Sequence, residues 1–219
     1  DYLYGSFVYD RDTKRVTCGV YRNGTETLTK LITADIMTGA VAIIPLSMDA
    51  EDGKSVSDCW QTGCSWNDAG TQAAFVYNGS IQIIDLSGKP VGSIPITEPV
   101  ISLRYLPGGE DLLAVFQNGL LCRYHVQDTV CCASINLADH CTGFYTVSAD
   151  RWQWVFPDEN TLLAVTDYGG FLIDTAQDSL KMKAQINQCI GYHAPSDRIL
   201  VAETYSYYGK NTTIGTFPR

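Results

Sequence analysis

Basic residues are few in this chain and form no cluster. The sequence has 15 Lys and Arg against 24 Asp and Glu, a formal net charge of −9. A protein that binds nucleic acid needs a basic stripe to displace counterions from the phosphates. An anionic membrane surface likewise attracts basic residues. We therefore expect neither nucleic acid nor a membrane among the partners of this protein.

Long apolar runs and a signal peptide are also missing. No run reaches the roughly 18 apolar residues of a membrane-spanning helix, and the start of the chain lacks a basic region followed by an apolar one. Cys18 and Cys122, two of eight cysteines, sit in apolar strand patterns, which favours reduced thiols and a cytoplasmic location. Three glycosylation-type sequons, at Asn23, Asn78 and Asn211, leave an extracellular location open.

Helical periodicity is nearly absent, and alternation of apolar and polar residues dominates. Two stretches fifty residues apart almost repeat each other: YLPGGEDLLAV from Tyr105 and VFPDENTLLAV from Val155. Each contains an apolar strand, a turn led by Pro, and a second apolar strand. Similar strand–turn–strand passages begin near Phe7, Ser65 and Gly191.

Each of these passages continues with a third β-rich strand, and all but the last with an outer fourth strand. Four short antiparallel strands in about 40 residues is the period of propeller blades. We therefore predict an all-β fold, a β-propeller of four-stranded antiparallel blades with about five blades visible. The blades are expected near residues 2–46, 62–97, 100–137, 152–187 and 188–219, with loop insertions near 47–61 and 138–151.

One passage carries a family resemblance. SIQIIDLSGKPV resembles the third-to-fourth strand passage of WD40-type repeats, where a Trp-Asp pair precedes a turn with Gly-Lys; Ile84 and Asp85 stand in place of that pair. ITADIMTGAVAI and FLIDTAQDSL are looser versions, and the Gly-His pair typical of the family is missing. The chain thus resembles a degenerate WD40-like (WD/YVTN-type) repeat domain. Its closing TIGTFPR is similar to the last blade of propellers that end large bacterial multidomain proteins.

The resemblance implies rings that most often have seven blades, whereas five units are visible here. Two arrangements stay open: a five-bladed ring whose last sheet is short, or a piece of a larger ring. The chain starts at Asp1 already in a strand pattern, which favours the piece. An incomplete ring would expose apolar blade faces, so self-association is expected in that case.

Metal binding and catalysis have little support in the sequence. The densest group of ligand-type residues lies between Cys122 and Cys141, and its members alternate between strand faces instead of pairing as zinc ligands do. No G-x-S-x-G, phosphate-binding loop or dinucleotide motif occurs. Paired carboxylates such as Glu110-Asp111 fall in predicted turns. We therefore expect no metal, no cofactor and no catalytic residue.

Aromatic residues near the starts of blades are the remaining candidates for function. Such positions lie toward the axial rim of a propeller, where Trp and Tyr can anchor a partner. Packing between blades is the other interpretation, and it is favoured because Trp is large enough to fill the wedge between two sheets. The polar loop TYSYYGKN adds tyrosines of the same kind. The candidate partner-binding residues are Trp60, Trp66, Tyr105, Trp152, Trp154, Tyr192, Tyr205, Tyr207 and Tyr208.

The expected function is non-catalytic. We expect a protein–protein interaction scaffold, or a sensor module of a larger protein, whose partner is another protein or another domain of the same chain. This expectation depends partly on analogy with other propellers. The alternative is a propeller that binds a small ligand or glycan, or a five-bladed hydrolase with carboxylates facing an axial cleft.

Overall fold

A computed structural model describes residues 2–10, 13–22, 27–48, 64–141, 144, 146, 152–176, 178–204 and 212–218. Within these ranges the chain forms β-strands and two short 3-10 helices, η1 (Leu137–His140) and η3 (Ala194–Ser196). Among the helices of the described residues, none has the length and apolar character of a membrane span.

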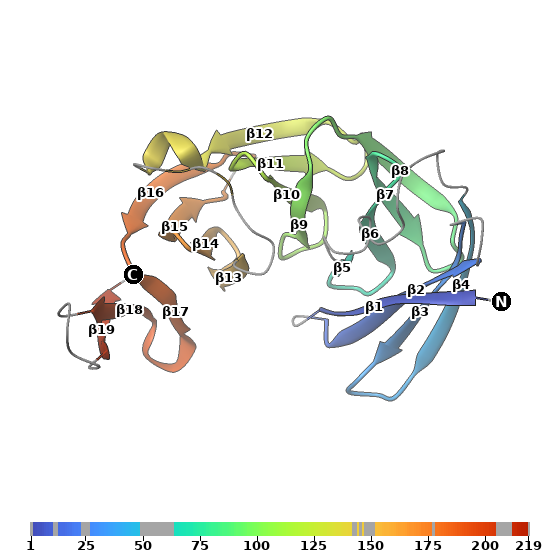
Figure 1. Cartoon of the computed structure of the whole chain (residues 1–219), viewed down its shortest axis with the longest axis horizontal. Coiled ribbons are helices and arrows are strands. Elements are labelled where there is room, and N and C mark those ends of the chain that lie inside the picture. Colours follow the sequence, from blue (N-terminus) through green and yellow to red (C-terminus); the bar gives the residue numbers. More distant parts are fainter. Residues whose placement is uncertain are drawn as a thin grey trace. The chain divides into compact units, whose positions relative to one another are not determined.

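The strands form five sheets that follow one another along the chain (Figure 1). The first contains β1 (Tyr2–Asp10), β2 (Arg15–Arg22), β3 (Leu28–Asp35) and β4 (Val41–Met48). The second contains β5 (Cys64–Trp66), β6 (Gln72–Tyr77), β7 (Ser80–Asp85) and β8 (Pro90–Pro95). The third contains β9 (Val100–Tyr105), β10 (Asp111–Phe116), β11 (Leu120–His125) and β12 (Cys131–Asn136).

The fourth sheet contains β13 (Gln153–Asp158), β14 (Thr161–Thr166), β15 (Gly169–Asp174) and β16 (Lys181–Ile186). The fifth contains β17 (Cys189–His193), β18 (Arg198–Thr204) and β19 (Thr212–Pro218). Neighbouring strands in each sheet are consecutive in the chain. This arrangement confirms the predicted all-β, β-propeller fold of four-stranded antiparallel blades.

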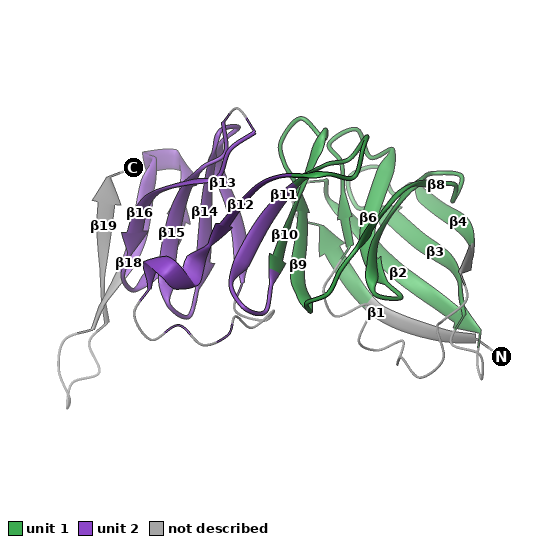
Figure 2. Ribbon diagram, turned by 90° about the horizontal axis from the view of Figure 1, so that it is seen from above, with its two compact units in different colours: residues 1–115, 124–131 green, residues 116–123, 132–219 purple. Residues whose placement is uncertain are grey.

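The chain divides into two compact units, coloured separately in Figure 2. Unit 1 contains residues 1–115 and 124–131, and unit 2 contains residues 116–123 and 132–219. The first and second sheets belong to unit 1, and the fourth and fifth belong to unit 2. The third sheet has residues in both.

The core of unit 1 lies where the first sheet packs on the second. Leu28, Leu31 and Ile44 of the first sheet meet Trp66 and Phe75 of the second, and none of the five is more than 2% exposed. Complete burial of each such side chain contributes about 1.5–3 kcal/mol. This packing therefore holds the two sheets together.

The core of unit 2 is built in the same way from the fourth and fifth sheets. Leu163 and Leu172 of the fourth sheet pack with Cys189 and Ile199 of the fifth. Gly170 sits in this interface, and a Cβ there would lie 2.7 Å from Cys189 Sγ. The close approach of the two sheets explains why glycine occupies the position.

An Asp at the end of the third strand closes the following turn in several sheets. Asp85 ends β7, and its Oδ1 accepts hydrogen bonds from the Ser87 hydroxyl at 2.6 Å and from the N–H groups of Ser87 and Lys89 at 2.8 and 3.0 Å. Asp35 and Asp174 hold the equivalent turns after β3 and β15. The Asp of the WD40-like passage therefore has a local role, which is to stabilise a turn.

These hydrogen bonds favour the ionised carboxylates and lower the pKa of all three Asp residues below the ordinary value of 3.8. The largest causes are the Thr38 N–H for Asp35, the Ser87 hydroxyl for Asp85 and the Ala176 N–H for Asp174. A carboxyl group whose pKa is lower in the folded state than in the unfolded state stabilises the fold. This contribution is complete above the unfolded-state pKa and is lost as the pH falls through the folded-state pKa.

We therefore expect the denaturant midpoint of the protein to fall as pH is lowered below about 3.8. A variant with Asp35→Asn, Asp85→Asn and Asp174→Asn keeps the acceptor oxygens but does not titrate. Its denaturant midpoint should depend less on pH over the same range. Equal pH dependence in the two proteins would contradict this role for the three carboxylates.

Candidate functional site

One face of the first sheet is covered by the second sheet. Residues that pair directly across antiparallel strands lie on the same face. Leu31 pairs with Ile44, and both are fully buried against the second sheet. Val8 packs on the same cluster from β1. This face therefore belongs to the core of unit 1.

The opposite face of the first sheet is apolar and exposed at both outer strands. On β1, 74% of Phe7 and 53% of Tyr9 are exposed; on β4, 65% of Val41 and 62% of Ile43 are exposed. The register places these residues in two rows that cross all four strands. We define the apolar face by these rows: Phe7, Cys18, Ile32 and Ile43, and then Tyr9, Val16, Ala34 and Val41.

In each of two other sheets, one row of this kind ends in a polar residue. In the second sheet, the row that passes through Phe75 and Gln82 ends at Ser93 on β8. In the fourth sheet, the row that passes through Phe171 ends at Gln185 on β16. The first sheet instead keeps Val41 and Ile43 on its outermost strand. These two rows of the first sheet therefore stay apolar to the outermost strand, whereas the row through Phe75 and the row through Phe171 end in polar residues.

This surface is not among the candidate sites predicted from the sequence. Phe7, Val41 and Ile43 look like ordinary core residues in a strand pattern. The passage VAII, which begins at Val41, is apolar at both odd and even positions, unlike the outer strand from Lys181 onward, which alternates with lysines. That lack of alternation is the sequence feature that could have indicated a strand with two apolar faces.

Three of the predicted partner-binding aromatic residues are buried. Trp66 is 2% exposed, Tyr105 is 3% exposed and Trp152 is 7% exposed. The indole N–H of Trp66 donates to Thr17 Oγ1 at 2.9 Å. Burial raises the pKa of the Tyr105 hydroxyl, with a smaller effect from Cys64. These three side chains pack inside the protein and present almost no surface, so we leave them out of the proposed interface.

The other predicted aromatic residues are partly buried or lie outside the described residues. Trp154 is partly buried and packs edge-on against Trp152, with ring centroids 4.9 Å apart. Tyr192 is partly buried, and its hydroxyl donates to Asp197 Oδ1 at 2.5 Å. The residues outside the described ranges are Trp60, Tyr205, Tyr207 and Tyr208.

A buried ion pair lies beside Trp66. Asp10 ends β1 and is 3% exposed; its Oδ1 lies 3.0 Å from Arg104 Nη1 of β9. Asp10 Oδ2 accepts the backbone N–H of Trp66 at 3.0 Å. The carboxylate thus connects three strands that are far apart in the sequence. We interpret this pair as structural, because both partners are engaged within the packed sheets.

Among the described residues, neither the buried thiols Cys64 and Cys189 nor the contact between His193 and Ser196 forms a catalytic arrangement. Burial, and then the charge of Asp10, raise the pKa of the Cys64 thiol, and burial raises that of Cys189, so neither favours the reactive thiolate. His193 Nδ1 lies 2.7 Å from Ser196 Oγ, but both residues are exposed in one short turn. A nucleophilic serine also needs a third group that orients the base.

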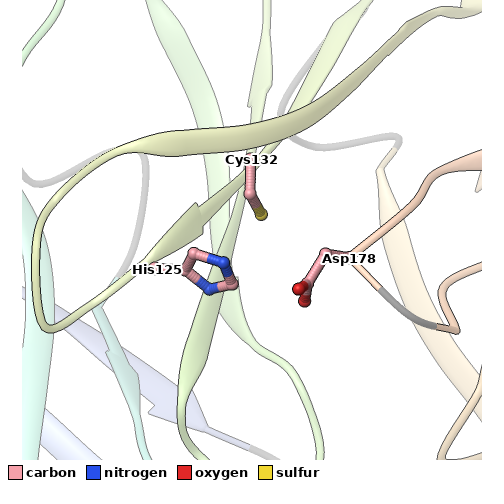
Figure 3. A group of neighbouring side chains, drawn as sticks. All are labelled: His125, Cys132 and Asp178. Carbon is pink, nitrogen blue, oxygen red and sulfur yellow. The ribbon is translucent and has the colours of Figure 1, made fainter.

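Figure 3 shows His125 of unit 1 together with Cys132 and Asp178 of unit 2. His125 Nδ1 lies 2.6 Å from Asp111 Oδ1 within unit 1. Within unit 2, Cys132 Sγ donates to the Arg123 carbonyl at 3.4 Å, and Asp178 pairs with Arg123 Nη2 at 3.3 Å. Protein contacts within each unit thus account for the three side chains, and we assign no metal site to them.

A shallow depression of about 560 Å³ lies on unit 2. Beside it, the rings of Tyr168 and Phe144 stack with centroids 4.7 Å apart. The depression contains one carboxylate, whereas glycoside hydrolysis usually requires two. Its lining residues are Cys141, Asp167, Tyr168, Gln185, Asn187 and Gln188.

No family model and no curated protein matches the sequence of this chain. Solved structures do match its fold. Hydrazine synthase of Kuenenia stuttgartiensis matches with a TM-score of 0.56 and 11% identity, over 97% of this chain and 65% of that chain. A protein of unknown function from Bacteroides caccae matches with a TM-score of 0.54 and 15% identity, over 85% of this chain and 67% of that one. At these identities the likeness shows the fold alone, and the chain has a β-propeller-like fold.

Proposed function

We propose that this protein is a non-catalytic WD40-like scaffold that binds another protein through the apolar face of its first sheet. The observation that carries the proposal is the exposure of Phe7, Tyr9, Val41 and Ile43 on one side of that sheet. Contiguous exposed apolar patches on soluble proteins mark surfaces that bind other proteins. Covering these side chains would remove them from water and supply the main driving force for association.

The sheet suits this function because it is held in place before a partner binds. Its opposite face is locked on the second sheet through Leu31 and Ile44, which are fully buried. A surface that is already ordered loses little conformational entropy on binding. The turn-closing residues Asp35, Asp85 and Asp174 support the WD40-like assignment, since they occupy the position of the Asp in the WD40 passage.

Site-specific photo-crosslinking in the source cells tests the proposal. We expect a benzoylphenylalanine side chain placed at Val41 to form a covalent adduct with a protein. The matched control is the same side chain at Val130, which is 54% exposed in the turn between β11 and β12. Mass spectrometry of the adducts identifies the partner. The proposal fails if Val41 gives no more adduct than Val130.

A further inference from the structure

We propose that the apolar face of the first sheet docks against the same face of a second copy of this chain, to form a two-fold symmetric dimer. This inference rests on the proposed function and names the partner at that surface. Three features of the molecule favour it: the chemistry of the face, the kind of surface that covers the other side of the same sheet, and the distribution of exposed apolar residues.

The chemistry of the face permits self-association. The two rows that define it contain only apolar side chains and the Tyr9 hydroxyl, with no charged residue. Lys30 lies in the next row on the same face, paired with Val20 and Pro45. An apolar centre with a polar rim is the usual anatomy of a protein interface. Two copies can therefore meet over these rows without bringing like charges together, although the whole chain has a net charge of −9.

The other side of the same sheet shows what kind of surface fits it. There the first sheet is covered by another antiparallel sheet, whose Trp66 and Phe75 pack on Leu31 and Ile44. Stacked sheets of this kind lie about 10 Å apart and interlock their side chains. A second sheet with an apolar face is accordingly the partner that the geometry of the first sheet favours.

Among the side chains that the structure describes, exposed large apolar residues gather on one sheet. Ten large hydrophobic residues are exposed among the described residues, and six of them belong to the first sheet or its β3–β4 turn. Within the described part of the chain, the exposed apolar surface that best matches this face is therefore the same face on a second copy. A two-fold axis brings identical patches together and closes the assembly at two copies. The six residues are Phe7, Tyr9, Ile36, Met37, Val41 and Ile43.

The exposed area of the face supplies more than half of what a specific dimer requires. Taking roughly 150–250 Å² for a fully exposed aromatic side chain, and somewhat less for Val and Ile, the four exposed residues of the two rows present on the order of 500 Å². A standard protein–protein interface buries about 800 Å² on each partner. The surrounding rim residues would supply the rest, so we expect a dimer that persists during purification.

Light scattering on a size-exclusion column, in reducing buffer and over a wide range of concentration, tests the inference. We expect the protein to have twice the monomer mass of 24.1 kDa. The double variant Val41→Lys, Ile43→Lys should be monomeric, with a dissociation constant raised at least about a hundredfold, because a charge in an apolar interface is costly. The matched control Val130→Lys adds the same charge at an exposed apolar position outside the face and should remain dimeric.

Three outcomes would overturn the inference. The first is a wild-type protein that stays monomeric at every concentration, and the second is a folded double variant that stays dimeric. The third is an adduct between benzoylphenylalanine at Val41 and a different protein, which keeps the proposed function but replaces the second copy. If the double variant loses its circular dichroism spectrum, irradiation of the purified Val41 benzoylphenylalanine protein decides: a covalent dimer supports the inference, and its absence contradicts it.

Discussion

Replacing Asp10 with asparagine is expected to lower the free energy of unfolding by about 3–5 kcal/mol, the usual cost of removing one partner of a buried ion pair. The Asp10 side chain is 2% exposed and that of Arg104 is 13% exposed. The substitution keeps the size of the side chain but removes the negative charge that compensates the guanidinium. Denaturant unfolding monitored by circular dichroism measures the loss.

Two further variants separate the ion pair from other effects of the substitution. Glu98→Gln removes a carboxylate charge at an exposed position and should change the free energy of unfolding by less than about 0.5 kcal/mol. Asp10→Asn combined with Arg104→Met removes both charges and should cost less than the sum of the two single changes. If Asp10→Asn destabilises no more than Glu98→Gln, the pair does not stabilise the fold.

Gly88→Ala is expected to destabilise unit 1 by about 2–5 kcal/mol, the sum of two effects. Gly88 lies in the turn between β7 and β8 with φ = +82°, where a Cβ costs about 1–2 kcal/mol in backbone strain. That Cβ would also lie 1.9 Å from the carbonyl oxygen of Pro45 in β4, so the backbone must move at a cost of about 1–3 kcal/mol. The loss is measurable by thermal and denaturant unfolding.

Gly39→Ala is the matched control for Gly88→Ala. Gly39 lies in the turn between β3 and β4 with a similar φ of +71°, but a Cβ there would meet nothing within 4 Å. Only the backbone strain of about 1–2 kcal/mol should remain. Equal losses in the two variants would mean that the contact with Pro45 does not limit the packing of the first two sheets.

The strands and turns of this protein could be predicted from its sequence because their causes are local. Alternation of apolar and polar residues predicts strands such as Ile81–Leu86. In the structure this strand is β7, which begins and ends one residue earlier, at Ser80–Asp85. The Asp85-containing passage resembles a WD40 turn, and in the structure Asp85 binds the backbone of that turn. Hydrogen bonds between residues two to four positions apart need no knowledge of the rest of the chain.

The surroundings of single side chains could not be predicted in the same way. The position of Trp66 near the start of a blade allows either an exposed rim or packing between blades. In the structure Trp66 is 2% exposed, because Asp10 and Thr17 accept its two N–H groups and the first sheet covers its ring. Those residues precede it by 56 and 49 positions. No spacing rule connects residues so far apart, since their proximity depends on how whole sheets pack.

The sequence by itself therefore determined the class of fold, the repeat and the turn chemistry. Each of these follows from side-chain alternation and from short-range hydrogen bonding. Only the tertiary structure decided which of the two faces of the first sheet is buried. Leu31 and Ile44 are fully buried on one side of the first sheet, and Val41 and Ile43 are more than half exposed on the other. Burial depends on what packs against a face, and a strand pattern contains no information about that neighbour.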